Sequence, residues 1–403
     1  MKYRRMLAAL IGAVTAVLSL TACAEDSSGG KKKKHDTEPL PDITTAELVK
    51  DMGIGINLGN TFESCGTWID SSSVSNYETG WGSPVITQPM IAGYAKAGFG
   101  VLRIPAAWSN MMQDNYTIHP DYLARVHEVV RWALEAKLYV ILNIHYDGGW
   151  WADFADAEKK DACMQKYIRI WEQLSAEFGD EGDHLVFESL NEEGCWDTLW
   201  NRYGSNTHGK AEAYALLNEI NQTFVNTVRG SGGKNAQRHL LIAGYATDIA
   251  LTCDDAFRMP EDPAGRCAVS VHYYTPATFC ILEEDANWGK MKTNWGSPRD
   301  LEELNGNLDR VQKTFADRGI PVIIGEYGVT KKKRTDAVIR LYLSAVCEGA
   351  VRRGLCPVLW DTPGNFYDRA NAKMYDEELR RQLLAAAGKP LPEETGQQTE
   401  AVA

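Results

Sequence analysis

The 403-residue sequence predicts a single (β/α)8 TIM barrel, an α/β fold of eight parallel strands that alternate with helices. Short runs rich in β-branched residues alternate with longer helical patterns from about residue 43 onward. The run Pro321–Ile324 delivers Glu326 where Gly325 loosens the strand, and the run Leu185–Leu190 leads to Glu192. Both carboxylates therefore fall at the carboxyl ends of strands, where barrel enzymes place their catalytic groups.

Helical patterns fill the spaces between the predicted strands. The runs 211–229, 301–318 and 335–353 each stop at a glycine, which is a common helix end. The run 138–145 is apolar on both faces, as is typical of a buried parallel strand. The predicted strands, in order, are 55–60, 100–105, 138–145, 185–192, 239–244, 268–274, 321–328 and 357–360. The other predicted helices are 44–52, 88–97, 121–136, 160–178 and 375–387.

The fifth unit is the least regular, because residues 245–267 hold little helical pattern. An open, doubly wound sheet is the alternative fold for such alternation. No glycine-rich phosphate loop follows the first predicted strand, and neither an internal repeat nor a second domain is visible. Repeated right-handed crossovers therefore favour the closed barrel as one domain over 42–388.

The amino-terminal residues read as an export signal. A positively charged start precedes the apolar run Met6–Leu20, which is too short for a comfortable membrane span and is followed by Thr21, Ala22 and Cys23. This resembles a bacterial lipoprotein signal over 1–22, with Cys23 lipidated, 23–41 a flexible linker and the chain anchored at the cell surface or outside the cell. An ordinary signal peptide with a chance cysteine is the alternative. Residues 389–403 are polar and are expected to be disordered.

Composition excludes several classes of partner. The formal net charge of -12 and the pI near 5.3 argue against nucleic acid, whose phosphates need a basic surface. Eight cysteines follow Cys23, and their spacing leaves disulfide pairing open. The sequence holds no CxxC pair and no HExxH helix, so we expect neither a metal nor another cofactor.

Polar or aromatic residues end nearly every predicted strand. They are Asn60, Arg103, His145, Asn191, Glu192, His272, Tyr274, Glu326 and Trp360. Each is unremarkable alone, but a barrel directs all of them into one bowl. Two glutamates in such a bowl can cleave a glycosidic bond if one stays protonated and the other ionised. Retaining enzymes hold the pair ~5–5.5 Å apart and inverting enzymes ~6.5–9.5 Å, a distance that sequence cannot measure.

A set of motifs across the barrel is similar to glycoside hydrolase family 5, the cellulase family of clan A, and most of all to its subfamily 4 endoglucanases. The matching residues are Asn57–Thr61, Glu78–Gly82, Arg103, His145, Phe187–Glu192, His272–Pro276, Glu326 and Trp360. The resemblance implies a retaining endo-β-1,4-glucanase that acts on β-glucan. We expect it to act as a monomer.

The resemblance also implies a role for each residue. Glu192 would be the general acid/base and Glu326 the nucleophile. Asn191 would bind the sugar 2-hydroxyl, and Trp360 would stack on the ring at the cleavage site. Arg103 and Tyr274 would hold Glu326 ionised, and His145 and His272 would orient the sugar and the acid. The residues expected to bind substrate farther out are Asn60, Glu63, Trp81, Trp150 and Trp151.

Two departures from the family pattern stand out. Glu193 replaces the usual proline after the acid/base, and it either raises the pKa of Glu192 or points away; we favour the second. Tyr146 stands where a second histidine often follows His145. Among the loop tryptophans we expect about half to be structural rather than part of a cleft: Trp81, Trp150, Trp151, Trp196, Trp200, Trp288 and Trp295.

The substrate remains open at this stage. Xyloglucan and mixed-linkage β-glucan fit the subfamily readily, and mannan or xylan fit it less well. A catalytically silent, glycan-capturing surface lipoprotein is the alternative from another class. That role would tolerate loss of a catalytic carboxylate, and both Glu192 and Glu326 are present.

Overall fold

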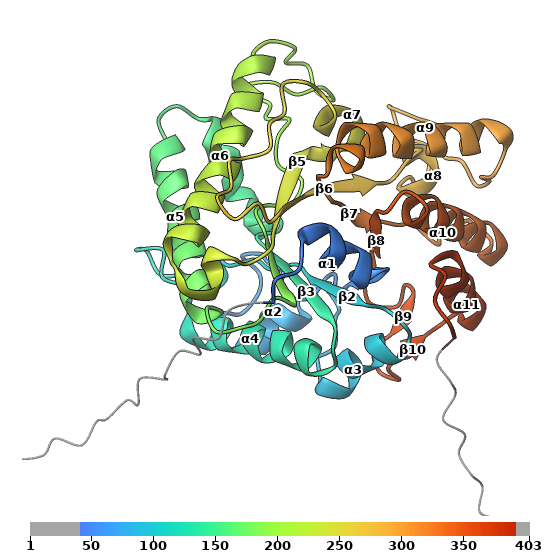
Figure 1. The fold of residues 1–403 in the computed structure, drawn as a ribbon, viewed down its shortest axis with the longest axis horizontal. Coiled ribbons are helices and arrows are strands. Elements are labelled where there is room, and N and C mark those ends of the chain that lie inside the picture. The colour runs from blue at the N-terminus through green and yellow to red at the C-terminus, as the bar shows by residue number, and fades with distance from the viewer. Residues whose placement is uncertain (1–40, 392–403) are drawn as a thin grey trace, which may run out of the picture. The chain divides into compact units, whose positions relative to one another are not determined.

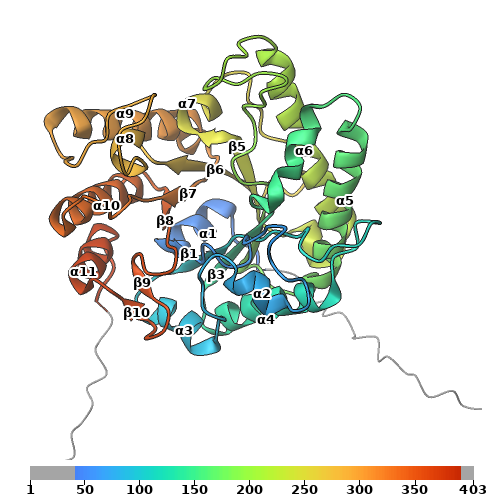
Figure 2. The same ribbon diagram turned by 180° about the vertical axis from the view of Figure 1, so that it is seen from behind.

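The computed structural model describes residues 41–391, and these form a closed barrel of eight strands in the order β1 to β8 (Figures 1 and 2). Every neighbouring pair is parallel, including β1 with β8, which closes the ring. The predicted (β/α)8 fold is therefore confirmed. Cys23, the signal over 1–22, the rest of the linker up to residue 40 and the tail from 392 lie outside the described residues.

The bounds of the elements are as follows. The barrel strands are β1 Gly55–Asn57, β2 Val101–Ile104, β3 Tyr139–Asn143, β4 Leu185–Glu188, β5 Leu240–Asp248, β6 Cys267–Tyr273, β7 Val322–Tyr327 and β8 Cys356–Leu359, with a small hairpin of β9 Tyr367–Asp368 and β10 Lys373–Met374. The helices are α1 Thr45–Met52, α2 Val74–Thr79, α3 Gln88–Lys96, α4 Pro120–Glu135, α5 Lys160–Glu177, α6 Lys210–Gly230, α7 Ile249–Thr252, α8 Ala277–Cys280, α9 Pro298–Thr314, α10 Asp336–Val351 and α11 Glu377–Ala386. Three 3-10 segments are η1 Asp147–Ala155, η2 Gly233–Ala236 and η3 Ala316–Arg318.

The fifth unit is as irregular as its sequence indicates, because only the four-residue helix α7 follows β5. One strand and one helix differ from expectation. β4 ends at Glu188, so Glu192 lies on the loop beyond it. The short helix α2 was not predicted, and it sits in the loop after β1.

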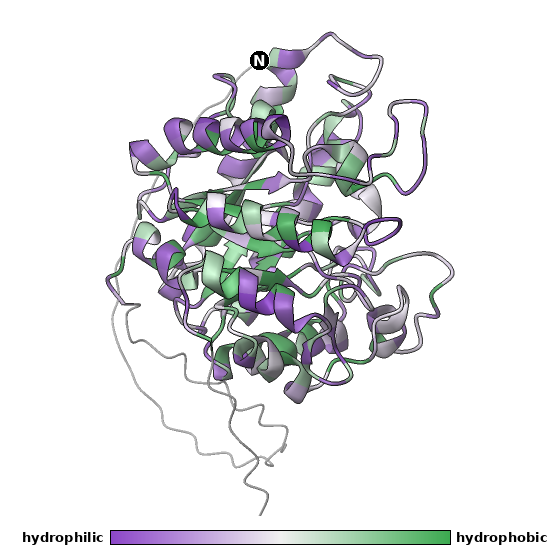
Figure 3. Ribbon diagram, turned by 90° about the vertical axis from the view of Figure 1, so that its right-hand side faces the viewer, coloured by the Kyte–Doolittle hydropathy of each residue, from purple (hydrophilic) through white to green (hydrophobic). Residues whose placement is uncertain are grey.

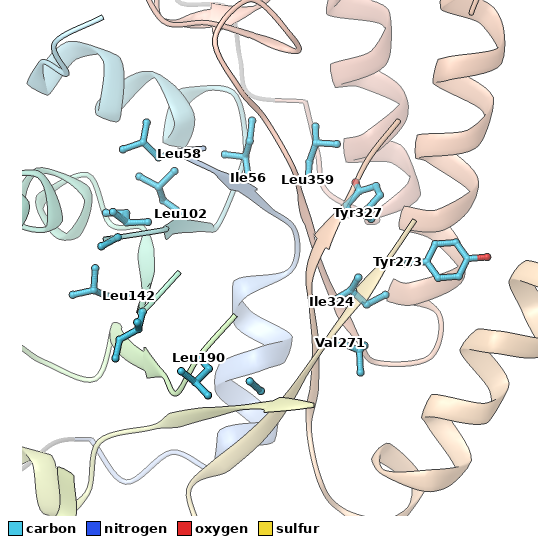
Figure 4. Close-up of a cluster of buried hydrophobic side chains, with 14 of the residues drawn as sticks. Ile56, Leu58, Leu102, Leu142, Leu190, Val271, Tyr273, Ile324, Tyr327 and Leu359 are labelled. Carbon is cyan, nitrogen blue, oxygen red and sulfur yellow. The ribbon is translucent and has the colours of Figure 1, made fainter. Parts of the chain in front are cut away.

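Strand side chains alternate between the barrel interior and the surrounding helices. Outward residues such as Ile56, Leu102 and Ile324 pack in the large core between strands and helices (Figures 3 and 4). Inward residues at the amino end of the barrel, including Val101 and Ile323, form a separate apolar cluster. The apolar face of α1 joins that cluster through Leu48, Val49 and Met52 and closes this end.

The next inward layer, toward the carboxyl ends of the strands, is polar. It holds the fully buried side chains of Asn57, Arg103, Asn143, Glu188 and Ser270. The barrel is thus filled by hydrocarbon at one end and by a hydrogen-bonded layer at the other. The polar end, at the carboxyl ends of the strands, is the end that α1 leaves open, so functional groups are expected there.

The cysteines and the helices of the described residues can be characterised further. All eight cysteines in the described part of the chain are free thiols. Among residues 41–391, no helix has the length and apolar composition needed to cross a bilayer.

A histidine joins α4 to the end of α5. His127 Nδ1 lies 2.6 Å from Glu177 Oε1, and its Nε2 lies 2.8 Å from Glu181 Oε1. Burial lowers the pKa of His127, but the hydrogen bonds to both carboxylates outweigh it and raise this pKa to about 9. The imidazolium is therefore the form that the fold favours.

We predict that His127→Gln loses about 1 kcal/mol of unfolding free energy at acidic pH, after allowance for the water around Glu177. Because the folded pKa is above the unfolded value of 6.5, the difference from wild type should be complete below pH 6.5 and vanish as the pH rises through about 9. Urea unfolding at several pH values measures it. His208→Gln, in an exposed loop, is the control, and a difference that grows with pH would contradict the prediction.

Candidate active site

Arg103 lies at the centre of the polar layer and is fully buried. Its Nε donates to Glu188 Oε2 at 2.7 Å, and its Nη1 donates to Glu326 Oε1 at 2.8 Å. Nη1 also donates to Asn57 Oδ1 at 3.1 Å, and Nη2 donates to Asn191 Oδ1 at 2.8 Å. Burial lowers the pKa of Arg103, yet the two carboxylates raise it overall, so the guanidinium keeps its charge.

Glu326 is buried between Arg103 and Tyr274. The Tyr274 hydroxyl donates to Glu326 Oε2 at 2.8 Å, opposite the oxygen that Arg103 binds. Burial raises the pKa of Glu326 above its ordinary value, and the Arg103 charge and the Tyr274 hydrogen bond offset part of this rise. The contacts expected of Arg103 and Tyr274 are thus present, and they oppose the cost of burying a carboxylate.

A β-bulge brings Glu326 to the inside of the barrel. β7 pairs Ile324 with Val271 and then Glu326 with His272, so Gly325 is the extra residue. A Cβ on Gly325 would lie 2.9 Å from Ser270 Oγ and 3.1 Å from His272 Nε2. Glycine therefore allows the bulge, and the bulge sets the direction of Glu326.

Glu192 faces the opening, with 49% of its side chain exposed. Its Oε1 lies 2.7 Å from His272 Nδ1. Burial against the protein wall raises the pKa of Glu192 to about 7, although Arg103 lowers it. The surrounding protein raises the pKa of this partly exposed carboxyl group because it limits the hydration of the charged form. Glu192 and Glu326 thus experience different surroundings, since only Glu326 touches the guanidinium.

The two carboxylates lie close together. Glu192, His272 and Glu326 each offer one atom, and these atoms all lie within 4.8 Å of one another. Atoms this close fit the ~5–5.5 Å separation of carboxyl groups at which one can attack an anomeric carbon directly better than the ~6.5–9.5 Å that leaves room for a water. Among residues 41–391, these three side chains are also the one group of three or more His, Cys, Asp or Glu residues close enough together to hold a metal ion.

Two histidines and a tryptophan flank the pair. The rings of His145 and Trp360 stack with centroids 5.7 Å apart and planes 6° apart. His145 Nε2 lies 3.9 Å from Glu326 Oε1. Burial, with Arg103, lowers the pKa of His145, and burial lowers that of His272 to about 4, so both are neutral rings near pH 7.

These groups line a cleft of about 770 Å³ at the carboxyl end of the barrel. From Glu192 and Glu326 it passes Trp360 and reaches the loops that follow β6, β7 and β8. Lys332 of the β7 loop pairs with Glu283 of the β6 loop at 2.9 Å, and Thr330 N donates to Cys280 O at 2.8 Å. Two loops far apart in sequence therefore form one wall.

Comparison with known proteins agrees with this geometry. The family model described as Cellulase (glycosyl hydrolase family 5) matches residues 62–365. The chain belongs to glycosyl hydrolase family 5.

Two curated members of family 5 are each 34% identical to the chain. Endoglucanase A of Clostridium longisporum aligns over 322 residues, which is 79% of this chain and 59% of that protein. The xyloglucan-specific endo-beta-1,4-glucanase of Bacteroides ovatus aligns over 354 residues, which is 81% of this chain and 66% of that protein. The chain therefore spans less than two thirds of the length of either relative.

Solved structures of the family extend the match. A GH5-4 broad specificity endoglucanase from an uncultured bovine rumen ciliate is 36% identical with a TM-score of 0.77, covering 86% of this chain and 98% of that one. A family 5 lichenase from Caldicellulosiruptor sp. F32, solved with cellotetraose, is 30% identical with a TM-score of 0.78, covering 88% and 98%. These likenesses assign this family 5 chain to subfamily 4.

Two of the residues predicted to bind substrate, Asn60 and Glu63, lie on the loop after β1. Glu63 is buried, and its carboxylate accepts from the amides of Asn60 and Thr61, the latter at 2.8 Å. It shapes the loop, and its part in substrate binding stays a prediction. Asn60 is partly exposed on that loop, and its contact with substrate stays a prediction as well.

The loop tryptophans differ in exposure. Trp196, Trp200 and Trp295 are buried, whereas Trp288 is 61% exposed. The three tryptophans predicted to bind substrate are partly buried. The Trp81 ring lies 6.5 Å from that of Tyr146, Trp150 Nε1 donates to Asp147 Oδ2 at 2.7 Å, and Trp151 Nε1 donates to Tyr146 O at 2.9 Å. Their contact with substrate stays a prediction.

Sequence reasoning missed Glu188 and Ser270. Ser270 Oγ donates to Glu188 Oε1 at 2.7 Å, which leaves the other oxygen for Arg103. The alternation of side chains along β4 could have identified Glu188, since it lies two residues after Val186, whose side chain points into the barrel.

Glu193 is buried, and its carboxylate accepts a hydrogen bond from Asn191 N at 2.6 Å, which stabilises the loop after β4. The causes of the Glu192 shift are burial and Arg103, whereas the charge of Glu192 is one of the causes that raise the pKa of Glu193, so the two carboxyl groups do interact.

We predict that Gly325→Ala costs about 1–3 kcal/mol of unfolding free energy, because the new Cβ must displace Ser270 Oγ from its bond to Glu188. The imidazole nitrogen resonances of His272 should shift as well. Gly306→Ala is the control, since no atom lies within 4 Å of its Cβ position in α9 and alanine favours a helix. Equal stability of the two variants in urea unfolding would contradict the prediction.

Proposed function

We propose that this chain is a retaining endo-β-1,4-glucanase that hydrolyses internal bonds of cellulose-like β-glucans by double displacement. The observation that carries the proposal is the separation of Glu192 and Glu326, whose nearest ligand atoms lie within 4.8 Å. The names of the relatives, endoglucanase, xyloglucan-specific endoglucanase and lichenase, support a β-glucan substrate.

The proposed reaction has two steps. Glu326 attacks the anomeric carbon while Glu192 gives its proton to the departing oxygen, which forms a glycosyl-enzyme intermediate. Glu192, now ionised, takes a proton from the water that releases the sugar. The pKa of Glu192, about 7, suits a group that must both donate and accept a proton.

Neighbouring residues have supporting roles in this proposal. Arg103 fixes the Glu326 carboxylate and, through Nη2, the amide of Asn191. Asn191 thereby presents its NH2 group to the sugar 2-hydroxyl, where hydrogen bonds strengthen in the transition state. Trp360 offers its face to the sugar ring, with His145 stacked behind it. His272 orients Glu192 through Nδ1.

Other substrates and roles are the competing proposals. Xyloglucan or mixed-linkage glucan fits the same machinery, and a mannanase or xylanase fits less well. A glycan-capturing lipoprotein without activity has no need for the paired carboxylates, and none of the relatives supports it. A reducing-sugar assay across soluble polysaccharides separates these possibilities, and turnover of none would favour capture.

We also propose that the protein is exported and anchored through lipidated Cys23. The support is the sequence alone, in which the apolar run Met6–Leu20 is followed by Thr21, Ala22 and Cys23. Mass spectrometry of the mature amino terminus tests the proposal, and an unlipidated terminus elsewhere would contradict it.

We predict that Glu326→Gln reduces kcat on a soluble β-glucan to below about one thousandth of wild type, because the amide cannot form the intermediate. Binding of an unreacted oligosaccharide should persist. Early-time NMR on the wild type should show the β anomer first. Near-normal turnover by the variant, or an α product from the wild type, would refute the mechanism.

We predict that kcat/KM for a natural glucan falls as the pH rises through about 7, because Glu192 must be protonated to act as the acid. An aryl glycoside with a very acidic leaving group needs no such proton, so its glycosylation step should lack this alkaline limb. The pair of pH profiles is the measurement. The same alkaline limb for both substrates would show that another group controls it.

A further inference from the structure

Glu193 is a buried carboxyl group that the two proposed reaction steps do not use. Only 1% of the residue is exposed, although glutamate is among the residues least often found inside a protein. Burial disfavours its charge, and within residues 41–391 no lysine, arginine or histidine forms an ion pair with it. Hydrogen bonds therefore hold this carboxyl group, and they show which residue it acts on.

The side chain of Glu193 binds the backbone of Asn191. Its Oε2 accepts from Asn191 N at 2.6 Å, which is short for a bond between an amide and a carboxylate. The side chain of Asn191 is fixed as well, because its Oδ1 accepts from Arg103 Nη2 at 2.8 Å. With its backbone amide and its side-chain oxygen both bound, Asn191 has its side-chain NH2 group left to offer to the cleft that it lines.

The backbone of Glu193 is held separately, by the neighbouring strand. Ala246 N of β5 donates to Glu193 O at 2.8 Å. Just beyond, Cys195 N donates to the Tyr245 hydroxyl of the same strand at 3.1 Å. Gly194 lies between these contacts, and a Cβ there would be 2.9 Å from the Tyr245 ring. The loop after β4 is thus packed against β5, and the Glu193 side chain extends from this fixed point back to the amide two residues earlier.

The Asn191 NH2 group lies beside the proposed nucleophile, because one guanidinium binds both residues. Arg103 Nη1 donates to Glu326 Oε1 and Nη2 donates to Asn191 Oδ1, each at 2.8 Å. A sugar whose anomeric carbon meets Glu326 therefore presents its 2-hydroxyl, on the adjacent carbon, toward Asn191. Hydrogen bonds to this hydroxyl strengthen in the transition state, and a misplacement of about 1 Å can cost ~100-fold in rate.

We propose that Glu193 is a positioning residue, which sets the place of the Asn191 NH2 group by holding the Asn191 backbone amide. The proposal rests on the proposed function, and it adds a residue that touches no substrate to the groups on which the transition state depends. The effect requires a hydrogen-bond acceptor at the end of a side chain of this length. Glutamine supplies one through its amide oxygen, whereas methionine fills a similar volume without a strong acceptor.

Two aryl glycosides test the proposal: dinitrophenyl β-cellobioside and its analogue that lacks the 2-hydroxyl on the sugar next to the dinitrophenyl group. Neither leaving group needs the proton of Glu192, so kcat/KM reports the attack of Glu326. Relative to wild type, Glu193→Met should lower kcat/KM for the first substrate by about tenfold or more, because the Asn191 NH2 group is displaced. The same variant should change kcat/KM for the 2-deoxy analogue less than about twofold, because that analogue has no hydroxyl for Asn191 to bind.

Glu193→Gln should keep both values within about threefold of wild type, because its amide oxygen still accepts from Asn191 N. Glu193→Ala also removes the acceptor and takes the place of Glu193→Met if methionine is not accommodated; urea unfolding shows that each variant is folded. Glu212→Ala, which changes an exposed glutamate of α6, is the control and should alter neither value.

A loss of equal size on both substrates would show that Glu193 supports only the fold of the loop, and it would overturn the proposal. A glutamine variant as slow as the methionine variant, or no loss in any variant, would overturn it as well. Failure of the proposed function is distinguishable, because the wild type would then turn over neither the aryl cellobioside nor any soluble glucan.

Discussion

The buried guanidinium of Arg103 is the interaction on which the site depends. An unpaired charge inside a protein costs several kcal/mol, so the polar layer is stable only when its acceptors are in place. Glu188, Asn57, Asn191 and Glu326 supply them. Because the guanidinium is planar and its donors point in fixed directions, one side chain sets the positions of both the proposed nucleophile and the amide beside it.

The same interaction separates the chemistry of the two glutamates. Glu326 shares the Arg103 guanidinium with Glu188, and the Tyr274 hydroxyl donates to the other oxygen of Glu326. Both carboxylate oxygens of Glu326 therefore accept hydrogen bonds, which favour the ionised form. Glu192 has a neutral histidine as its hydrogen-bond partner and is raised in pKa by the cleft wall. Carboxyl groups so close together need such unequal surroundings if one is to carry the proton and the other the charge.

Sequence could predict the barrel and most of the central residues, and the reasons are physical. The alternation of apolar runs fixes the fold, and residues at strand ends must meet in one bowl. Arg103, His272 and Glu326 follow from that rule. Glu63 does not, because its direction depends on a loop in which Asn60 adopts a φ of 55°. Sequence shows a carboxylate there but not the amides that it meets.

Other features depend on register or on distant segments. The bulge at Gly325 reverses the side-chain parity of β7, so a strict alternation of two would have sent Glu326 outward. The backbone of Glu193 is held by Ala246 of β5, a contact for which neither segment has a local signature. These contacts exist only once the barrel has closed.

The apolar plug formed by α1 has a consequence for access. Pro41 O and Asp42 Oδ1 meet Arg266 just before β6, and Lys389 lies against Gly53 and Gly100, just before β1 and β2. The described chain thus enters and leaves at the base of the barrel, and neither end crosses its mouth. A polymer much longer than the cleft can therefore lie across that mouth and overhang it on both sides without meeting Pro41, Asp42 or Lys389.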